Sequence, residues 1–141
     1  LIRDLRPHGE AFAFLTFTAV WAMDTAAYAA GRGFGRHALA PTLSPKKTWE
    51  GAAAGFIAAI AVSLAFQKFM LHEAVTPLMA VVIGVLIGSM GQLSDLAESM
   101  IKRDAGAKDS GALLPGHGGV FERCDAYILC APAVYYALSF K

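Results

Sequence analysis

Long apolar runs separated by polar links dominate the hydrophobic pattern of this chain. The runs cover residues 11–30, 51–71, 76–92 and 126–140. A helix that spans a bilayer needs about 20 mainly apolar residues, and the first two runs supply that number outright. The third run reaches it if its helix continues toward Ile101, and the fourth is shorter. None alternates with the period of two that a membrane β-barrel requires. The pattern predicts an all-α fold: a polytopic helical membrane protein with about four transmembrane helices.

Composition supports a membrane setting. The chain has 141 residues, of which 56% are hydrophobic and 16% are charged, and its mean hydropathy is +0.49. Soluble domains have about 25% charged residues, so a soluble bundle of very apolar helices is the less favoured alternative. The length suits one membrane-embedded region, residues 1–141. Because the chain starts at Leu1 without an initiator Met or a signal pattern, we interpret it as part of a longer protein.

Small residues recur at a spacing that favours close helix contact. Glycines enclose the segments GAAAG at 51–55 and GVLIG at 84–88. Small residues four apart let two helix backbones approach closely in lipid. Cys124 and Cys130 are six residues apart, which fits small apolar helix residues better than a metal site.

The links predict the topology. The turn at residues 72–74 is long enough only for a hairpin, so the links 31–50 and 102–123 must lie together on the opposite face. These two links hold eight of the twelve Lys and Arg residues. Because basic links stay in the cytoplasm, we expect both links to face it, in a multi-pass protein of the bacterial inner membrane.

The third predicted helix carries a polar stripe. Gln92, Asp95, Ser99 and Lys102 follow one helix face, and Glu98 lies beside them, four residues before Lys102. One interpretation is a helix that leaves the membrane with solvated charges. The other is a binding site, because a carboxylate this close to hydrocarbon normally has a partner or a cation.

Residues 99–125 concentrate charge beside the membrane. They contain four basic residues, four acidic residues, a histidine and five glycines. Lysine and arginine bind phosphate, glycines let backbone N–H groups approach an anion, and carboxylates bind a hard divalent cation. Asp95, Glu122 and Asp125 are the candidate cation ligands. The combination predicts phosphate chemistry at a membrane surface.

The first link has related features. Asp24 lies in an apolar helix with Tyr28 one turn later, which indicates either a functional carboxylate or a structural one. Ser44 followed by Pro45 predicts a helix that begins there, with Ser44 as its N-cap. Free N–H groups at that start, beside Lys46 and Lys47, would hold a phosphate. The alternative is a basic membrane anchor.

Taken together, these motifs resemble the C-terminal portion of the phosphatidate cytidylyltransferase (CDP-diacylglycerol synthase) family. The resemblance extends over nearly the whole chain from Asp24. The matching motifs, in chain order, are Asp24…Tyr28…Gly31…Phe34-Gly35, then Ser44-Pro45-Lys46-Lys47-Thr48-Trp49-Glu50-Gly51, then Asp95-Leu96-Ala97-Glu98-Ser99, then Lys102-Arg103, Lys108-Asp109, Pro115-Gly116-His117-Gly118-Gly119 and Glu122-Arg123-Cys124-Asp125.

The resemblance implies a magnesium-dependent nucleotidyltransferase of phospholipid biosynthesis. Its substrates would be CTP and phosphatidate or a related lipid phosphate, and its cofactor Mg²⁺, alone or with a second cation. It implies metal ligands at Asp95, Glu122 and Asp125. The implied catalytic residues are Asp95, Lys102, Arg103, Lys108, His117, Glu122, Arg123 and Asp125. The implied substrate-binding residues are Asp24, Tyr28, Ser44, Lys46, Lys47, Glu98, Ser99, Gly118 and Gly119. The lipid bilayer is a partner, a homodimer is compatible with the sequence, and no nucleic-acid partner is expected.

The chain also departs from the family pattern. Glu122 stands where the family has Asp, and Ser94 where it has Gly. The extra methylene of Glu122 predicts altered metal geometry, weaker metal binding or a changed activity, since Mg²⁺ demands near-octahedral coordination. Two alternatives stay open: an ion-coupled transporter that uses Asp24 and Asp95, and an inactive member that binds nucleotide or lipid. We also expect residues 1–141 alone to lack a complete lipid-binding site.

Overall fold

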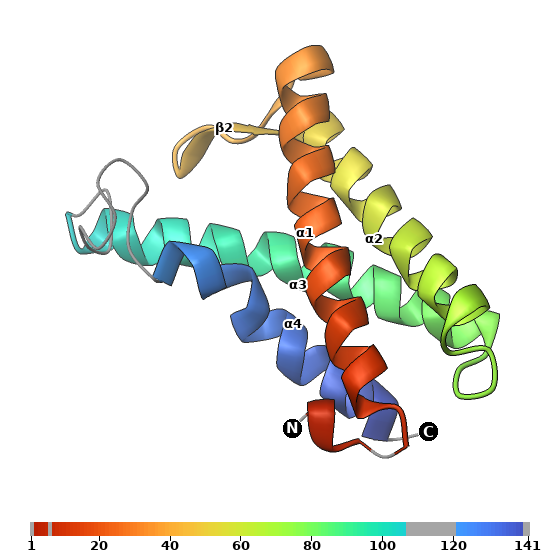
Figure 1. Ribbon diagram of the computed structural model, residues 1–141. Helices are drawn as coiled ribbons and strands as arrows, with labels where there is room; N and C mark the ends of the chain where they lie inside the picture. The colour runs from red at the N-terminus through yellow and green to blue at the C-terminus, as the bar shows by residue number, and fades with distance from the viewer. Residues whose placement is uncertain (1, 6, 107–120, 140–141) are drawn as a thin grey trace.

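The computed structural model describes residues 2–5, 7–106 and 121–139, and its side-chain description of the last range begins at Asp125. The largest elements are four α-helices (Figure 1). A short 3-10 helix and a two-stranded hairpin complete the fold. The bounds in chain order are η1 (Ile2–Asp4), α1 (Gly9–Phe34), β1 (Ala38–Ala40), β2 (Ser44–Thr48), α2 (Trp49–Phe69), α3 (Pro77–Asp104) and α4 (Phe121–Ser139).

The mainly helical prediction is confirmed, and each apolar run largely coincides with one of the four helices. α3 continues past Ile101, to Asp104, so the third run meets the condition for spanning length. In the described part of the chain, α2 and α3 are the helices long and apolar enough to cross a membrane. Only 17% of the apolar window of α2 is buried, so most of its apolar side chains face outward. These two helices indicate a membrane protein, whereas four membrane crossings stay a prediction.

The helices pack in sequence order. α1 packs on α2, α2 on α3 and α3 on α4, while η1 lies beside the C-terminal end of α4 (Figure 1). One apolar cluster joins the helices. Its largest fully buried members include Leu15 and Met23 from α1, Ile83 and Ile87 from α3, and Val134 from α4.

The predicted small-residue contacts lie at the helix crossings. A Cβ atom on Gly55 of α2 would be 2.9 Å from the Met23 carbonyl oxygen of α1. A Cβ atom on Gly84 of α3 would be 2.5 Å from the Ile60 Cα atom of α2. Both neighbours are backbone atoms, which cannot rotate away as the end of a side chain can. Glycine is therefore required for these two backbone approaches.

Substitution at the α2–α3 crossing should destabilise the protein. We expect Gly84→Ala to lower the free energy of unfolding by about 1–3 kcal/mol, because the added methyl group overpacks the contact. Thermal unfolding in detergent measures the effect. Gly33→Ala is the matched control, since a Cβ atom there meets nothing within 4 Å. Equal stability of the two variants would contradict the assigned crossing.

The hairpin corrects two expectations. The chain is not purely α-helical, and Ser44 does not cap a helix: Ser44–Thr48 is a strand that pairs antiparallel with β1. Thr48 is the N-cap of α2 instead, and its hydroxyl accepts a hydrogen bond from the Gly51 N–H at 3.2 Å. Pro45 is tolerated in a strand of a two-stranded ribbon, where not every N–H has to pair.

α3 is the element that carries the polar stripe out of the apolar region. Its 28 residues give a helix about 42 Å long, against a hydrocarbon thickness of about 30 Å. If Pro77 lies at one boundary, the other boundary falls about 20 residues later, near Asp95 and Glu98. The link between α2 and α3 lies at the far end of the molecule from the hairpin (Figure 1). α2 and α3 thus form the helical hairpin predicted from the short turn at residues 72–74, and this turn lies away from the β1–β2 hairpin.

Candidate functional site

A cavity of about 660 Å³ lies between α1, the β-hairpin, α2 and α3. It is lined by residues from all four elements, so it forms only in the packed structure. Six of the residues proposed from the sequence line it: Asp24, Tyr28, Ser44, Lys46, Lys47 and Asp95. The structure thus brings the first link and the stripe on α3 to one place.

An ion pair joins the two sides of this cavity. Lys47 Nζ on β2 lies 2.8 Å from Asp95 Oδ2 on α3. The two side chains are 32% and 22% exposed, so the pair is partly shielded from water. Such shielding strengthens the attraction between charges relative to an exposed surface pair. Lys47 therefore holds the hairpin against α3 at the position of the predicted metal ligand.

Three polar residues of the cavity lie outside the site proposed from the sequence: Arg32, Thr48 and Gln92. Arg32 on α1 lines it and donates a hydrogen bond from Nη1 to the Tyr28 hydroxyl at 2.9 Å. Gln92 lines it and donates from Nε2 to the Ala52 carbonyl of α2 at 3.0 Å. The sequence could have indicated Arg32 as a site residue, because Asp24, Tyr28 and Arg32 follow one another at four-residue intervals on one helix face.

A second polar cluster follows the same face of α3 toward its end. Glu98 is buried and pairs with Lys102, with 2.9 Å between the charged atoms, as its spacing predicted. The Asp125 side chain of α4 lies close enough to Glu98 and Asp95 to interact electrostatically with both. Ser99 Oγ donates to the Asp95 backbone carbonyl at 2.9 Å, so its hydroxyl is satisfied within α3.

Ser94 explains one departure from the family pattern. Its buried hydroxyl donates a hydrogen bond to the Asp125 backbone carbonyl on α4. A glycine could not make this contact. The serine thus joins α3 to the start of α4, next to the carboxyl groups of Glu98 and Asp125.

Several predicted residues are not gathered at the cavity by the described structure. Arg103 is exposed near the end of α3 and is not among the cavity-lining residues. Lys108, His117, Gly118 and Gly119 lie outside the described residues. Glu122 and Arg123 belong to α4, but their side chains lie outside the description. Their proposed roles stay predictions.

The carboxylates suit a hard cation by type. Within the described residues, no three His, Cys, Asp or Glu side chains are grouped closely enough to hold a metal ion. Asp95 is paired with Lys47, and Asp125 lies near Asp95 and Glu98. Asp95 and Glu98 lie on adjoining turns of α3, and Asp125 lies at the start of α4. Carboxylate oxygens of this kind are the ligands that Mg²⁺ prefers. A magnesium site here would require Asp95 to exchange its lysine partner for the cation.

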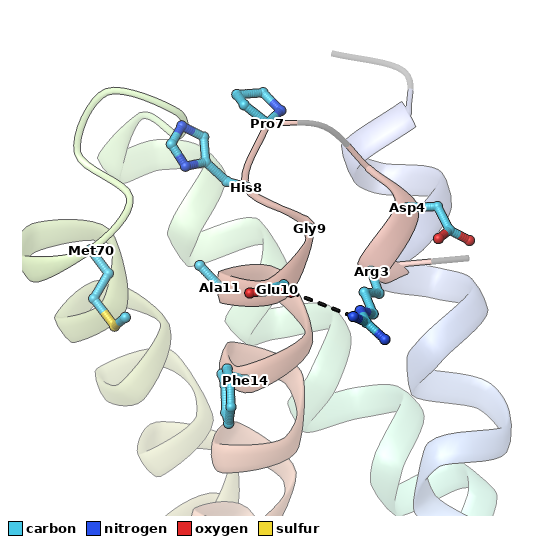
Figure 2. A pocket seen from close by; sticks show the side chains of 9 residues that line it. All are labelled: Arg3, Asp4, Pro7, His8, Gly9, Glu10, Ala11, Phe14 and Met70. Atoms are coloured by element: carbon cyan, nitrogen blue, oxygen red, sulfur yellow. Dashed lines mark ion pairs between the residues drawn. The ribbon is translucent and has the colours of Figure 1, made fainter.

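A second cavity, of about 940 Å³, lies at the other end of α1 (Figure 2). It is lined by Met70 and residues of the N-terminal segment, among them His8 and the ion pair of Arg3 with Glu10. These two charged side chains are 3.6 Å apart and 78% and 77% exposed. An exposed pair of this kind contributes little, and no residue proposed from the sequence lines this cavity. The cavity beside Asp95 is therefore the candidate site.

Comparisons with known proteins identify the family of this chain. The model of the cytidylyltransferase family matches residues 1–141. A phosphatidate cytidylyltransferase of a Synechocystis species is 43% identical over 92% of this chain and 44% of its own length. Proteins of the same name from Mycobacterium bovis and Bacillus subtilis are 40% and 36% identical, over 94% and 98% of this chain. The chain spans about half the length of these relatives, and none of the three is named as a transporter.

Proposed function

The chain belongs to the cytidylyltransferase family, and we propose that it forms the catalytic part of a membrane CTP:phosphatidate cytidylyltransferase. The observation that carries this proposal is the cavity beside Asp95. There, three cations on α1 and β2 meet two carboxylates on α1 and α3: Arg32, Lys46, Lys47, Asp24 and Asp95. A site of both charge signs at the edge of hydrocarbon suits a nucleotide and a lipid phosphate that react together.

The proposed reaction joins two anions. A phosphate oxygen of phosphatidate attacks the α-phosphorus of CTP and forms a new P–O bond, while the bond from the α-phosphorus to the bridging oxygen breaks. CDP-diacylglycerol forms, and pyrophosphate leaves with the electron pair of the broken bond. The attacking oxygen is already ionised, so the site needs no strong general base. It must offset the repulsion between the substrates and stabilise the leaving group.

The cations of the cavity suit those tasks. Lys46 and Lys47 project from β2, and Arg32 lies one turn after Tyr28 on α1, so phosphate oxygens can be contacted from two sides. Lys102 is paired with buried Glu98, which fixes its position near the end of α3. Fixed charges of this kind require little reorganisation when charge develops in the transition state.

Magnesium is part of the proposal. Asp95, Asp125 and Glu122 would hold it, and when bound it would neutralise phosphate charge and polarise the α-phosphate. These carboxylates would hold the cation from α3 and the start of α4, and Lys47 would then be released from Asp95 to contact phosphate. The orientation of both polar links toward the cytoplasm, where CTP is available, belongs to the same proposal.

Direct turnover tests the function. Membranes that contain the full-length protein are supplied with CTP labelled at the α-phosphate, phosphatidate and Mg²⁺. We expect label in a chloroform-soluble product, with one pyrophosphate released for each lipid formed. A protein that binds CTP but yields no labelled lipid would favour the inactive member, and lack of both binding and turnover would leave the transporter.

Metal dependence supplies a separate prediction. Chelation with EDTA should abolish turnover, and added Mg²⁺ should restore it. Without the cation, the carboxylates would add to the negative charge of the two substrates. Glu122→Asp should lower the Mg²⁺ concentration for half-maximal rate by about tenfold, since Mg²⁺ tolerates little deviation from ideal geometry. Glu73→Asp, in the link at the other end of the molecule, is the control. An unchanged requirement in Glu122→Asp would remove Glu122 from the metal site.

A further inference from the structure

Glu50 makes an unusual set of contacts for a residue in the first turn of a helix. Its Oε2 atom accepts hydrogen bonds from the backbone N–H groups of Arg36 and His37, at 3.2 and 3.4 Å. Its Oε1 atom lies 2.7 Å from His37 Nδ1. An ionised carboxylate only accepts, so Nδ1 carries the hydrogen in this contact. One carboxylate thus binds three donors that all lie just before β1.

The backbone adds a fourth contact at the same place. The Trp49 N–H donates to the His37 carbonyl oxygen at 3.0 Å. His37 is therefore tied to the start of α2 through its ring, its N–H and its carbonyl. We define the His37–Glu50 clip as these contacts between His37 and the segment Trp49-Glu50. The clip closes the base of the β1–β2 hairpin, because His37 directly precedes β1 and Trp49 directly follows β2.

The hairpin carries three cavity-lining residues of the proposed site: Ser44, Lys46 and Lys47. Its two strands have only three and five residues, and their register is irregular between Ala38 and Ala40. A two-stranded ribbon of this size is marginally stable by itself. Its position over the cavity therefore depends on attachments to the helices, among them the clip at its base and the Lys47–Asp95 pair at the cavity.

We propose that Glu50 is a positioning residue: through the His37–Glu50 clip it orients the hairpin so that Lys46 and Lys47 meet the phosphates of the nucleotide. This inference rests on the proposed function for its substrate. It assigns to Glu50 no contact with substrate, and Glu50 does not line the cavity. The clip and the Lys47–Asp95 pair act on the same hairpin from two sides. Without the clip, Lys46 and Lys47 are still present, but the hairpin that carries them is held less firmly over the cavity.

Two measurements on the full-length protein test the clip. The first is the kinetics of CTP turnover in Glu50→Ala. We expect KM for CTP to rise about tenfold, the equivalent of one or two lost hydrogen bonds, with kcat changed less than twofold. The second is the spectrum of a nitroxide on Thr42→Cys, an exposed position at the hairpin turn, in a background of Cys124→Ser and Cys130→Ala. Its motion should become faster when Glu50→Ala is added.

The control is Glu10→Ala. Glu10 is also a glutamate in the first turn of a helix and pairs with Arg3, but it lies at the opposite end of α1, so both readouts should stay unchanged. The double variant His37→Ala/Glu50→Ala should resemble Glu50→Ala, because both substitutions open the same clip. An unchanged KM, an unchanged nitroxide spectrum, or a fall in kcat at constant KM would each overturn the positioning role. If the parent protein makes no CDP-lipid, the proposed function fails, while the spectrum still decides whether the clip holds the hairpin.

Discussion

Asp95→Asn is expected to reduce CDP-diacylglycerol formation by about 1,000-fold, a loss of about 4 kcal/mol of transition-state stabilisation. Asparagine keeps the size of the side chain and one oxygen but removes the charge. That charge is paired with Lys47 in the structure and is the one proposed to hold the cation. Initial rates at saturating CTP, phosphatidate and Mg²⁺ measure the effect.

The control for this substitution is Asp104→Asn. Asp104 is the last residue of the same helix and is exposed, so its loss should change the rate less than twofold. Thermal unfolding of both variants separates a chemical effect from a folding effect. If Asp95→Asn retained more than a tenth of the parent rate while remaining folded, the site would have to be centred elsewhere.

Lys47→Ala is expected to reduce kcat/KM for CTP by about 100-fold, or about 2.7 kcal/mol. The substitution removes a phosphate-binding charge and one attachment of the hairpin, and it leaves the partly buried Asp95 carboxylate without its lysine partner. Steady-state kinetics with varied CTP measure the change. Lys47→Arg should recover part of the loss, because the positive charge returns with different geometry.

Lys68→Ala is the matched control for Lys47. Lys68 lies in the last turn of α2, with its ammonium group 5.7 Å from the centre of the Phe69 ring and far from the cavity. Its removal should leave kcat/KM unchanged. Equal losses in the two lysine variants would mean that the overall positive charge of the protein matters, and that Lys47 has no particular role.

The sequence predicted the helices and the meeting of distant charges well, because both depend on strong local signals. Apolar runs of membrane length identify helices within a few residues. The short 72–74 turn brings the two polar links together, which the Lys47–Asp95 contact confirms for the first link and α3. The Glu98–Lys102 pair follows from its four-residue spacing.

The first link was less predictable. Ser44-Pro45 is a good helix-start signal, yet Thr48 caps α2 and residues 44–48 form a strand. Contacts between residues distant in sequence favour the strand over a helix at residues 44–48. Glu50 accepts hydrogen bonds from the N–H groups before β1, and Lys47 pairs with Asp95 of α3. Such contacts leave no periodic trace in a short segment. Arg32 was missed for another reason, since its basic character was ascribed to orientation in the membrane.

The continuity of α3 has a mechanical consequence. One unbroken helix runs from Pro77 in the apolar part to Asp104, and it carries Asp95 where it leaves that part. Spanning helices adapt to bilayer thickness by tilting. A tilt of the apolar half must move the acidic half with it, while the hairpin that carries Lys47 is attached to α2. The position of Asp95 relative to the membrane surface thus depends on the tilt of one continuous helix.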